Sequence, residues 1–202
     1  EYFGQGYDLV TSKQAQQAFD VSRESKEMRD AYVRNGFGQR CLLARRLVEA
    51  GVRFVQVNLG KNSSWDTHRR NFVNLKDNLL PPMDLAVSAL LEDLSASGLL
   101  DETLVIVSGE FGRTPKINKD AGRDHWGPCN TMLFAGGGVP GGRIVGSTDR
   151  LGASVTSEKV LPQNFAATVY NALGIPRDAH WIDLDSRPHH VYAGDPIRKI
   201  YG

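Results

Sequence analysis

Helical periodicity is the clearest pattern along the chain. Between residues 69 and 97 the apolar positions recur three and four residues apart, which is typical of a helix with one buried face. The residues that define this face are Phe72, Leu75, Leu79, Met83, Ala86, Val87, Leu90, Leu91 and Leu94. Pro81 and Pro82 are expected to interrupt the helix, because proline lacks a backbone donor and clashes with the preceding turn.

Shorter helices are predicted on either side of this segment. Their ranges are 8–19, 24–32, 38–50 and 165–173. Thr11 and Ser12 are candidate caps for the first of them, because a hydroxyl can accept from the free N–H groups of a first turn. Gly51 and Gly174 are expected to end the last two, since glycine readily adopts the left-handed conformation of a helix C-cap.

Three segments have the composition of strands, namely 53–59, 103–108 and 131–135, and a short fourth is expected at 143–145. The second is continuously apolar, as in a strand covered on both faces. Strands that alternate with amphipathic helices predict an α/β fold with a largely parallel sheet. Ligands of such sheets bind beyond the carboxyl ends of the strands, so the loops after these segments should carry the chemistry.

Composition narrows the function classes. The 202 residues are enough for one domain, and we expect a single α/β domain in which 1–50 is a helical lead-in and 51–202 holds the sheet and site loops. With 24 Lys and Arg against 23 Asp and Glu, composition offers no case for nucleic acid or an anionic membrane as partner. The longest apolar runs fall short of the roughly 18 residues that a membrane span needs.

The loop after the first predicted strand contains Asp66 and His68. In extended backbone, residues two apart project to the same side, so both side chains could reach one cation. A carboxylate with an imidazole suits zinc or another divalent transition metal. The alternative is a surface aspartate beside a histidine that caps the following helix.

Glu110 follows the apolar segment 103–108 directly, where a carboxylate is poorly solvated unless it is paired or bound to metal. We interpret Glu110 as a metal ligand and Arg113 as a bidentate anchor for an anionic group. The alternative is a structural ion pair between the two.

The polar loop 116–128 contains Arg123, Asp124 and His125. Loops of this length without structure of their own are usually functional or disordered. His125 is a candidate third ligand, and Asp124 is either a ligand or the group that orients one. The alternative is a histidine stacked under Trp126 without metal. Together the loops predict a divalent-metal site, with zinc as first choice and calcium, magnesium or manganese as alternatives.

Two other patterns in the sequence are weaker indications of a functional site. The glycines at 136–138 and 141–142 lack the order of a phosphate-binding loop and predict a turn. His180, His189 and His190 lie in polar sequence and are expected to be solvated.

Several of these segments resemble a known family. Residues 101–112 are similar to a strand and loop of the alkaline phosphatase/sulfatase superfamily, 135–145 to its glycine turn, and 161–175 to the helix that follows. The WDTH, GEFGRTP and GRDHWG motifs resemble, more closely, a bacterial sulfatase-like branch known as domain of unknown function 1501, over residues 7–200.

The resemblance implies a three-layer α/β/α sandwich without its N-terminal strands. It implies a metal-dependent hydrolase of sulfate or phosphate esters, which acts on a small-molecule or glycan ester outside the cytoplasm. The implied metal ligands are Asp66, His68, Glu110 and His125, with Asp124 behind them. The implied substrate-binding residues are Arg113, Thr114 and Arg123.

The chain also departs from the family pattern. Glu110 and Phe111 stand where the superfamily has Asp-His, and the spacing from Asp66 to His68 is shorter than usual. Nothing matches the strand that carries the nucleophile, so we expect the chain to be the C-terminal part of a longer protein. These departures favour, as an alternative, a catalytically degenerate module that binds an anionic glycan or a protein. A metallopeptidase ranks last, because H-E-x-x-H is absent.

Overall fold

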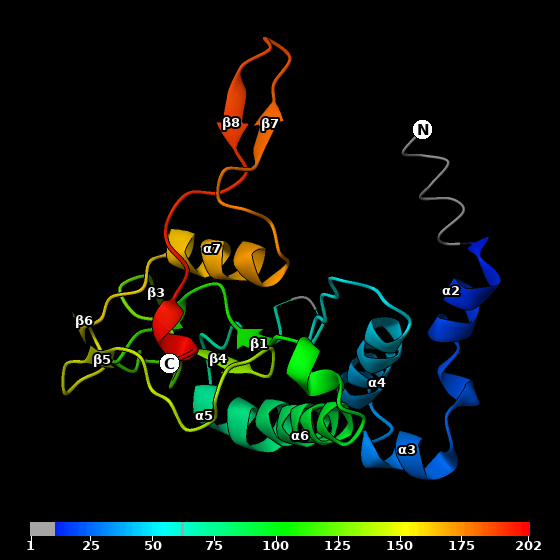
Figure 1. Ribbon diagram of the computed structural model, residues 1–202. Helices are drawn as coiled ribbons and strands as arrows, with labels where there is room; N and C mark the ends of the chain where they lie inside the picture. The colour runs from blue at the N-terminus through cyan, green and yellow to red at the C-terminus, as the bar shows by residue number, and fades with distance from the viewer. Residues whose placement is uncertain (1–10, 62) are drawn as a thin grey trace. The chain divides into compact units, whose positions relative to one another are not determined.

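The computed structural model describes residues 11–61 and 63–202 (Figure 1). Within this range the chain divides into two compact units. The first holds the described residues up to 100 together with 117–124, and the second holds 101–116 and 125–202. No helix in the described part of the chain combines the length and apolar character that crossing a bilayer requires.

The first unit is helical. In chain order it contains α2 (Lys13–Phe19), the 3-10 turn η1 (Val21–Arg23), α3 (Lys26–Ala31), α4 (Gly36–Glu49), α5 (Asn71–Asn74), the π-helical η2 (Leu75–Leu79) and α6 (Leu80–Ala96). Polar side chains cap α2, α3 and α4, since Ser12, Ser25 and Asn35 accept from backbone N–H groups of each first turn. The helices predicted over the first 50 residues are therefore confirmed, apart from residues 8–10, which lie outside the described range.

The long predicted helix is confirmed from Asn71 to Ala96, but its interruption takes an unexpected form. Pro81 and Pro82 occupy the first turn of α6, where a missing N–H is harmless. The five residues before α6 are π-helical. A wider turn at this point absorbs the change of hydrogen-bond register that the prolines impose, so the chain continues without leaving the helix.

The core of the first unit lies between α4 and α6. Its fully buried members are Tyr32, Cys41, Leu42 and Ala86. Burial raises the pKa of the Cys41 thiol to about 11, which makes this residue an inert packing element at neutral pH.

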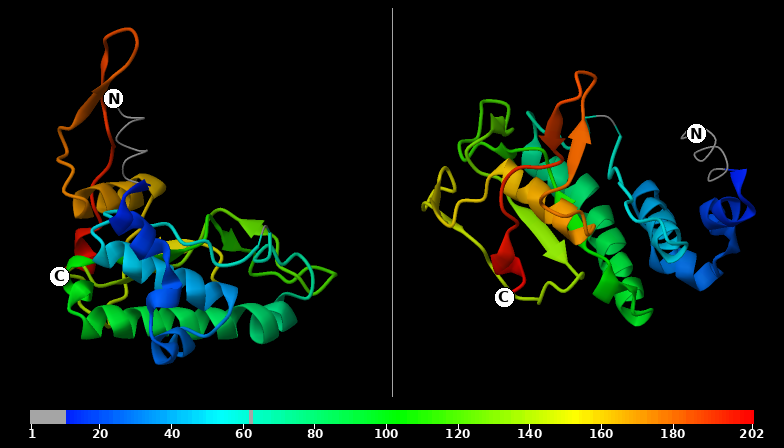
Figure 2. Two further views of the ribbon diagram at one scale, coloured as in Figure 1. Left: turned by 90° about the vertical axis from the view of Figure 1, so that its right-hand side faces the viewer. Right: turned by 45° about the horizontal axis from the view of Figure 1, so that its top comes forward.

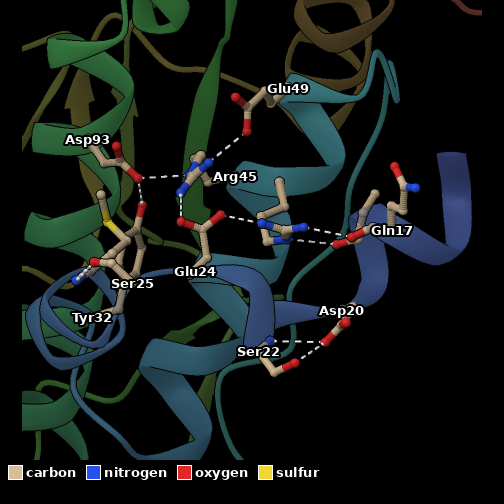
Figure 3. A network of polar contacts seen from close by, with 12 residues as sticks. Gln17, Asp20, Ser22, Glu24, Ser25, Tyr32, Arg45, Glu49 and Asp93 are labelled. Carbon is tan, nitrogen blue, oxygen red and sulfur yellow. Dashed lines mark hydrogen bonds and ion pairs between the residues drawn. The ribbon is translucent and has the colours of Figure 1, made fainter.

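A buried ionic network adds to this core (Figure 3). The Arg45 guanidinium lies between three carboxylates, at 3.0 Å from Glu24, 2.6 Å from Glu49 and 2.8 Å from Asp93. The contact with Asp93 involves Nε and is an ion pair without hydrogen-bond alignment. Asp93 also accepts a 2.9 Å hydrogen bond from the Tyr32 hydroxyl. The network thus joins α4 to α6 and to the segment before α3.

The strand predicted at 53–59 is wrong. Its side chains do alternate, with Val55, Val57 and Leu59 half-buried and Phe54 63% exposed. However, no strand pairs with this segment among the described residues. Composition can favour an extended backbone, but a ladder also requires a partner, and the sequence of one segment does not specify it.

The second unit contains short strands and one longer helix. In chain order its elements are β1 (Val105–Ser108), β2 (Gly112–Arg113), β3 (His125–Trp126), β4 (Met132–Ala135), β5 (Ser147–Thr148), β6 (Val155–Ser157), α7 (Pro162–Ala172), β7 (His180–Ile182), β8 (Pro188–His190) and the 3-10 turn η4 (Arg198–Ile200). The chain enters this unit through the 3-10 turn η3 (Leu99–Glu102). Strands predicted at 103–108 and 131–135, and the helix at 165–173, correspond to β1, β4 and α7.

The predicted α/β/α sandwich with a largely parallel sheet is wrong. The described strands form four two-stranded sheets, and each of them is antiparallel. β1 pairs with β4 so that Val105 faces Ala135 and Ser108 faces Met132. A parallel pair needs a crossover, usually a helix, whereas the segment between β1 and β4 forms the β2–β3 hairpin and brings the chain back in the opposite direction.

Two other local predictions can be compared with the second unit. The strand expected at 143–145 is wrong, because β5 begins only at Ser147, after Gly146 has turned the chain with φ of +83°. The glycine turn at 136–138 is confirmed, since all three residues have positive φ and Val139 N–H donates to the Gly136 carbonyl.

α7 is the packing centre of the second unit. Phe165 contacts Phe134 of β4 edge to face, with ring centroids 6.3 Å apart. The buried Thr168 hydroxyl donates to the Asn164 carbonyl and accepts from Ile197 N–H, which ties the C-terminal segment to the helix. The β7–β8 hairpin, by contrast, extends away from α7 (Figures 1 and 2).

Candidate metal centre

Consecutive tight turns bring Asp66 and His68 together in the first unit. Thr67 N–H donates to the Trp65 carbonyl and His68 N–H to the Asp66 carbonyl, each over two residues as in a γ-turn. Asp66 Oδ1 lies 3.0 Å from His68 Nε2. The two side chains therefore meet as expected, although the backbone between them is turned rather than extended.

Asp124 holds the other side of the same imidazole. Its Oδ1 lies 2.7 Å from His68 Nδ1. Asn118 Nδ2 donates to this carboxylate and to the His68 carbonyl, at 3.0 Å each. His68 and Asp66 remain 41% and 33% exposed at their side chains, so solvent and ions can reach the pair.

Asn118 supports the Asp124 side of this cluster and was not predicted from the sequence. Its Oδ1 accepts from the N–H groups of Asp120 and Gly122, and its own N–H donates to the Gly122 carbonyl. These bonds give residues 117–124 a defined turn. The signal lay in the sequence Asn-Lys-Asp-Ala-Gly, because asparagine, aspartate and glycine are the residues of side-chain-stabilised turns.

The beginning of α5 anchors this loop. Arg70 N–H donates to the Asp120 carbonyl and Asn71 N–H to the Ala121 carbonyl. The buried side chains of Asn71 and Thr67 are hydrogen-bonded to each other. The metal-ligand candidates of the first unit thus rest on a helix start rather than on a free loop.

In the second unit, His125 lies on β3 opposite Arg113 of β2. The His125 ring packs on Phe111 with centroids 4.3 Å apart, and the Arg113 guanidinium lies 5.6 Å from the Phe111 centroid. The alternative of a histidine stacked under Trp126 is not formed, because successive residues of β3 project to opposite faces and the Trp126 indole donates to the Ala153 carbonyl.

The remaining predicted residues are Glu110, Thr114 and Arg123. Glu110 is exposed in the bend after β1, and no ion pair joins it to Arg113 in the described part of the chain. Thr114 Oγ1 donates to the Lys116 carbonyl at 2.8 Å. Arg123, in the first unit, lies 5.4 Å from the Phe72 ring centroid. Each unit therefore gathers only part of the predicted set.

The geometry around His68 suits a cation. Both ring nitrogens face carboxylate oxygens, which only accept, whereas a neutral imidazole has a single N–H. If Nδ1 donates to Asp124, the lone pairs of Nε2 and Asp66 Oδ1 face each other. Ligand atoms bound at about 2.0–2.1 Å to one tetrahedral zinc ion lie roughly 3.3 Å apart, so the two atoms, at 3.0 Å, need to separate by only about 0.3 Å to share an ion. A carboxylate on the far nitrogen is also the usual support for a metal-binding histidine.

Comparison with known proteins identifies a family but no characterised relative. A family model described as "Protein of unknown function (DUF1501)" matches residues 1–201. No curated protein and no solved structure matches the chain.

Proposed function

Since the chain belongs to the DUF1501 family of proteins of unknown function, we propose its activity from the site itself, as a metal-dependent hydrolysis of sulfate or phosphate esters. The observation that carries the proposal is the position of His68 between two carboxylates, Asp66 and Asp124. Such an arrangement is stable with a neutral imidazole when a cation lies between Nε2 and Asp66.

Asp66 and His68 would bind the ion, which we propose to be zinc, with calcium, magnesium or manganese as alternatives. His125 is the proposed third ligand on the basis of the GRDHWG motif that contains it. Glu110 is proposed for a second metal position. The bound ion would supply Lewis-acid polarisation of the ester oxygen.

The proposed ester class rests on the WDTH, GEFGRTP and GRDHWG motifs alone. The antiparallel sheets of the second unit lend the superfamily resemblance no support. Arg113 and Arg123 are cations suited to an anionic ester, and Thr114 offers a hydroxyl beside Arg113. We further propose that the nucleophile comes from sequence outside this chain, and that the protein acts outside the cytoplasm on a small-molecule or glycan ester.

The test combines metal binding with turnover. Zinc titrated calorimetrically into the metal-free chain should bind at the Asp66–His68 centre, and Asp66→Asn and His68→Ala should each lower the number of bound ions by one. Asp120→Asn is the matched control, since this acid lies in the same loop and contributes only backbone groups to its hydrogen bonds. The full-length protein should then hydrolyse an aryl sulfate or aryl phosphate. Unchanged binding in both variants would refute the metal centre, and metal binding without turnover would refute the hydrolase.

The role of Asp124 gives a separate prediction. Asp124→Asn should lower zinc affinity about 10- to 100-fold, the usual cost of losing the partner that orients a metal-bound histidine. The amide can still contact Nδ1 but no longer carries the charge that makes the imidazole a stronger donor. Calorimetric titration beside Asp120→Asn measures the difference. Equal affinities in the two variants would show that Asp124 does not support the ligand.

A second candidate function has its own observation. Phe111 packs on His125 with tilted rings and lies beside the Arg113 guanidinium, so these residues form a cationic and aromatic surface instead of a ligand pair. We therefore also consider a module that binds an anionic glycan or protein without turnover. Binding to sulfated glycans that is equal before and after chelation, and lost in Arg113→Ala, would favour this candidate over the hydrolase.

A further inference from the structure

The β7–β8 hairpin carries three of the five histidines of the chain, His180, His189 and His190. All three are exposed, as the sequence predicted, but they are not independent. His180 lies directly opposite His190 in the antiparallel register, and Trp181 lies opposite His189. The hairpin therefore presents one histidine pair on one face and a tryptophan–histidine pair on the other, since successive side chains alternate across a strand.

The hydrogen-bond pattern shows how close the histidine pair is held. Val191 N–H donates to the Ala179 carbonyl, and Asp183 N–H donates to the Arg187 carbonyl. Because hydrogen-bonded and non-hydrogen-bonded positions alternate, His180 and His190 occupy a non-hydrogen-bonded pair, in which opposite side chains approach most closely. Their ring centroids are 4.2 Å apart, with an interplanar angle of 39°.

We propose that His180 and His190 together bind a divalent transition-metal ion, at a site separate from the centre around His68. Imidazole nitrogen is a preferred ligand of zinc, copper and nickel. Two imidazoles fixed by one ladder form a chelate with little further loss of side-chain freedom. In the described chain neither ring is hydrogen-bonded to a carboxylate. Water, or a donor from another molecule, would complete the coordination.

His189 differs from this pair and serves as the matched control. Its Nε2 lies 2.7 Å from Asp183 Oδ2, and its ring stacks on Trp181 at 4.7 Å. The hydrogen bond to His189 is the main cause of the lowered pKa of Asp183. A histidine already held in this way, on the opposite face, should contribute nothing to a chelate between His180 and His190.

The experiment uses the whole chain with His68→Ala, so that the first centre does not contribute. Nickel and zinc are titrated separately, and binding is followed by calorimetry and by the imidazole NMR signals. We expect one ion per chain, with the signals of His180 and His190 shifting together. Adding His180→Ala or His190→Ala should lower the affinity at least about tenfold, because even the loss of a residue that only orients a ligand usually costs that much. Adding His189→Ala should leave it unchanged.

Three results would overturn the proposal: no binding, binding that survives both alanine variants, or an equal loss in His189→Ala. None of them bears on the ester hydrolase, because the background variant already lacks His68. Conversely, if the wild-type chain fails to bind metal at Asp66 and His68, the hairpin titration is unaffected.

Discussion

Replacing Arg45 with alanine is expected to lower the free energy of unfolding by about 3–5 kcal/mol, the usual cost of removing one partner from a buried ion pair. The Arg45 side chain is 9% exposed, and those of Glu24 and Asp93 are 15% and 16% exposed. Without the guanidinium, these two carboxylates would stay largely out of water with one counter-charge fewer. The loss should therefore exceed the value of any single contact.

The ionisation of the network supports this expectation. Burial by itself would lower the pKa of Arg45, but the charges of Asp93 and Glu24 outweigh it and hold that pKa above its ordinary value. Burial and Asp93 raise the pKa of Tyr32, so its hydroxyl keeps the proton that it donates. The network thus stabilises the charged form of Arg45, and a neutral side chain of similar length would not replace this arginine.

Urea unfolding followed by circular dichroism measures the effect. Arg34→Ala is the control, because Arg34 pairs with Asp30 on the surface, where both side chains are nearly half exposed, and its removal should hardly change the midpoint. Arg46 also contacts Glu24, so Arg45→Ala combined with Glu24→Gln should be less damaging than the sum of the two changes. If Arg45→Ala unfolds at the same urea concentration as Arg34→Ala, the network does not stabilise the fold.

Arg45 also illustrates what the sequence can and cannot predict. The helix that carries it was predicted from apolar spacing and from Gly51, which are local signals, and α4 ends there with Gly51 at φ of +88°. Which carboxylates Arg45 and Arg46 pair with depends on partners in other elements, one of them on α6. Local signals predicted most helices, whereas such long-range pairs were not predictable.

The prediction of a parallel sheet was wrong for the same reason. The apolar composition of β1 and β4 was recognised, but their antiparallel order depends on how the connecting segment folds. The segment 53–59 has strand composition without a strand partner in the described chain. The tendency to form a strand is set by the residues of one segment, whereas the pairing of strands depends on the whole fold. The predicted parallel sheet was therefore wrong.

At the candidate site, residue chemistry was more informative than secondary structure. Asp66, His68 and Asp124 were singled out because carboxylates and imidazoles bind metals, and the first unit brings them together. Asn118 escaped notice because an amide is not a usual zinc ligand, and its role is to fix the turn that presents Asp124. For residues that support a site by fixing its backbone, the sequence shows only the composition of a turn and does not indicate the site.

The support that this turn gives leads to the second large expected effect. Gly122→Ala should lower zinc affinity about 100-fold, which is the upper end of the cost of displacing the partner of a metal-bound histidine. A Cβ at residue 122 would lie 1.8 Å from the His68 carbonyl oxygen and 2.5 Å from Arg69 N. Both are backbone atoms, so the clash cannot be relieved by rotating a side chain, and His68 and the 117–124 turn must move apart.

Gly127→Ala is the matched control for this change, because it lies in the same predicted loop, has no atom within 4 Å of the added Cβ and does not have positive φ. Calorimetric zinc titrations compare the two variants, and circular dichroism checks that both remain folded. A folded Gly122→Ala protein that binds zinc as Gly127→Ala does would show that the 117–124 turn does not position His68. If affinity falls only in Gly122→Ala, the close approach of two backbones, which requires the smallest residue, is what sets the ligand geometry.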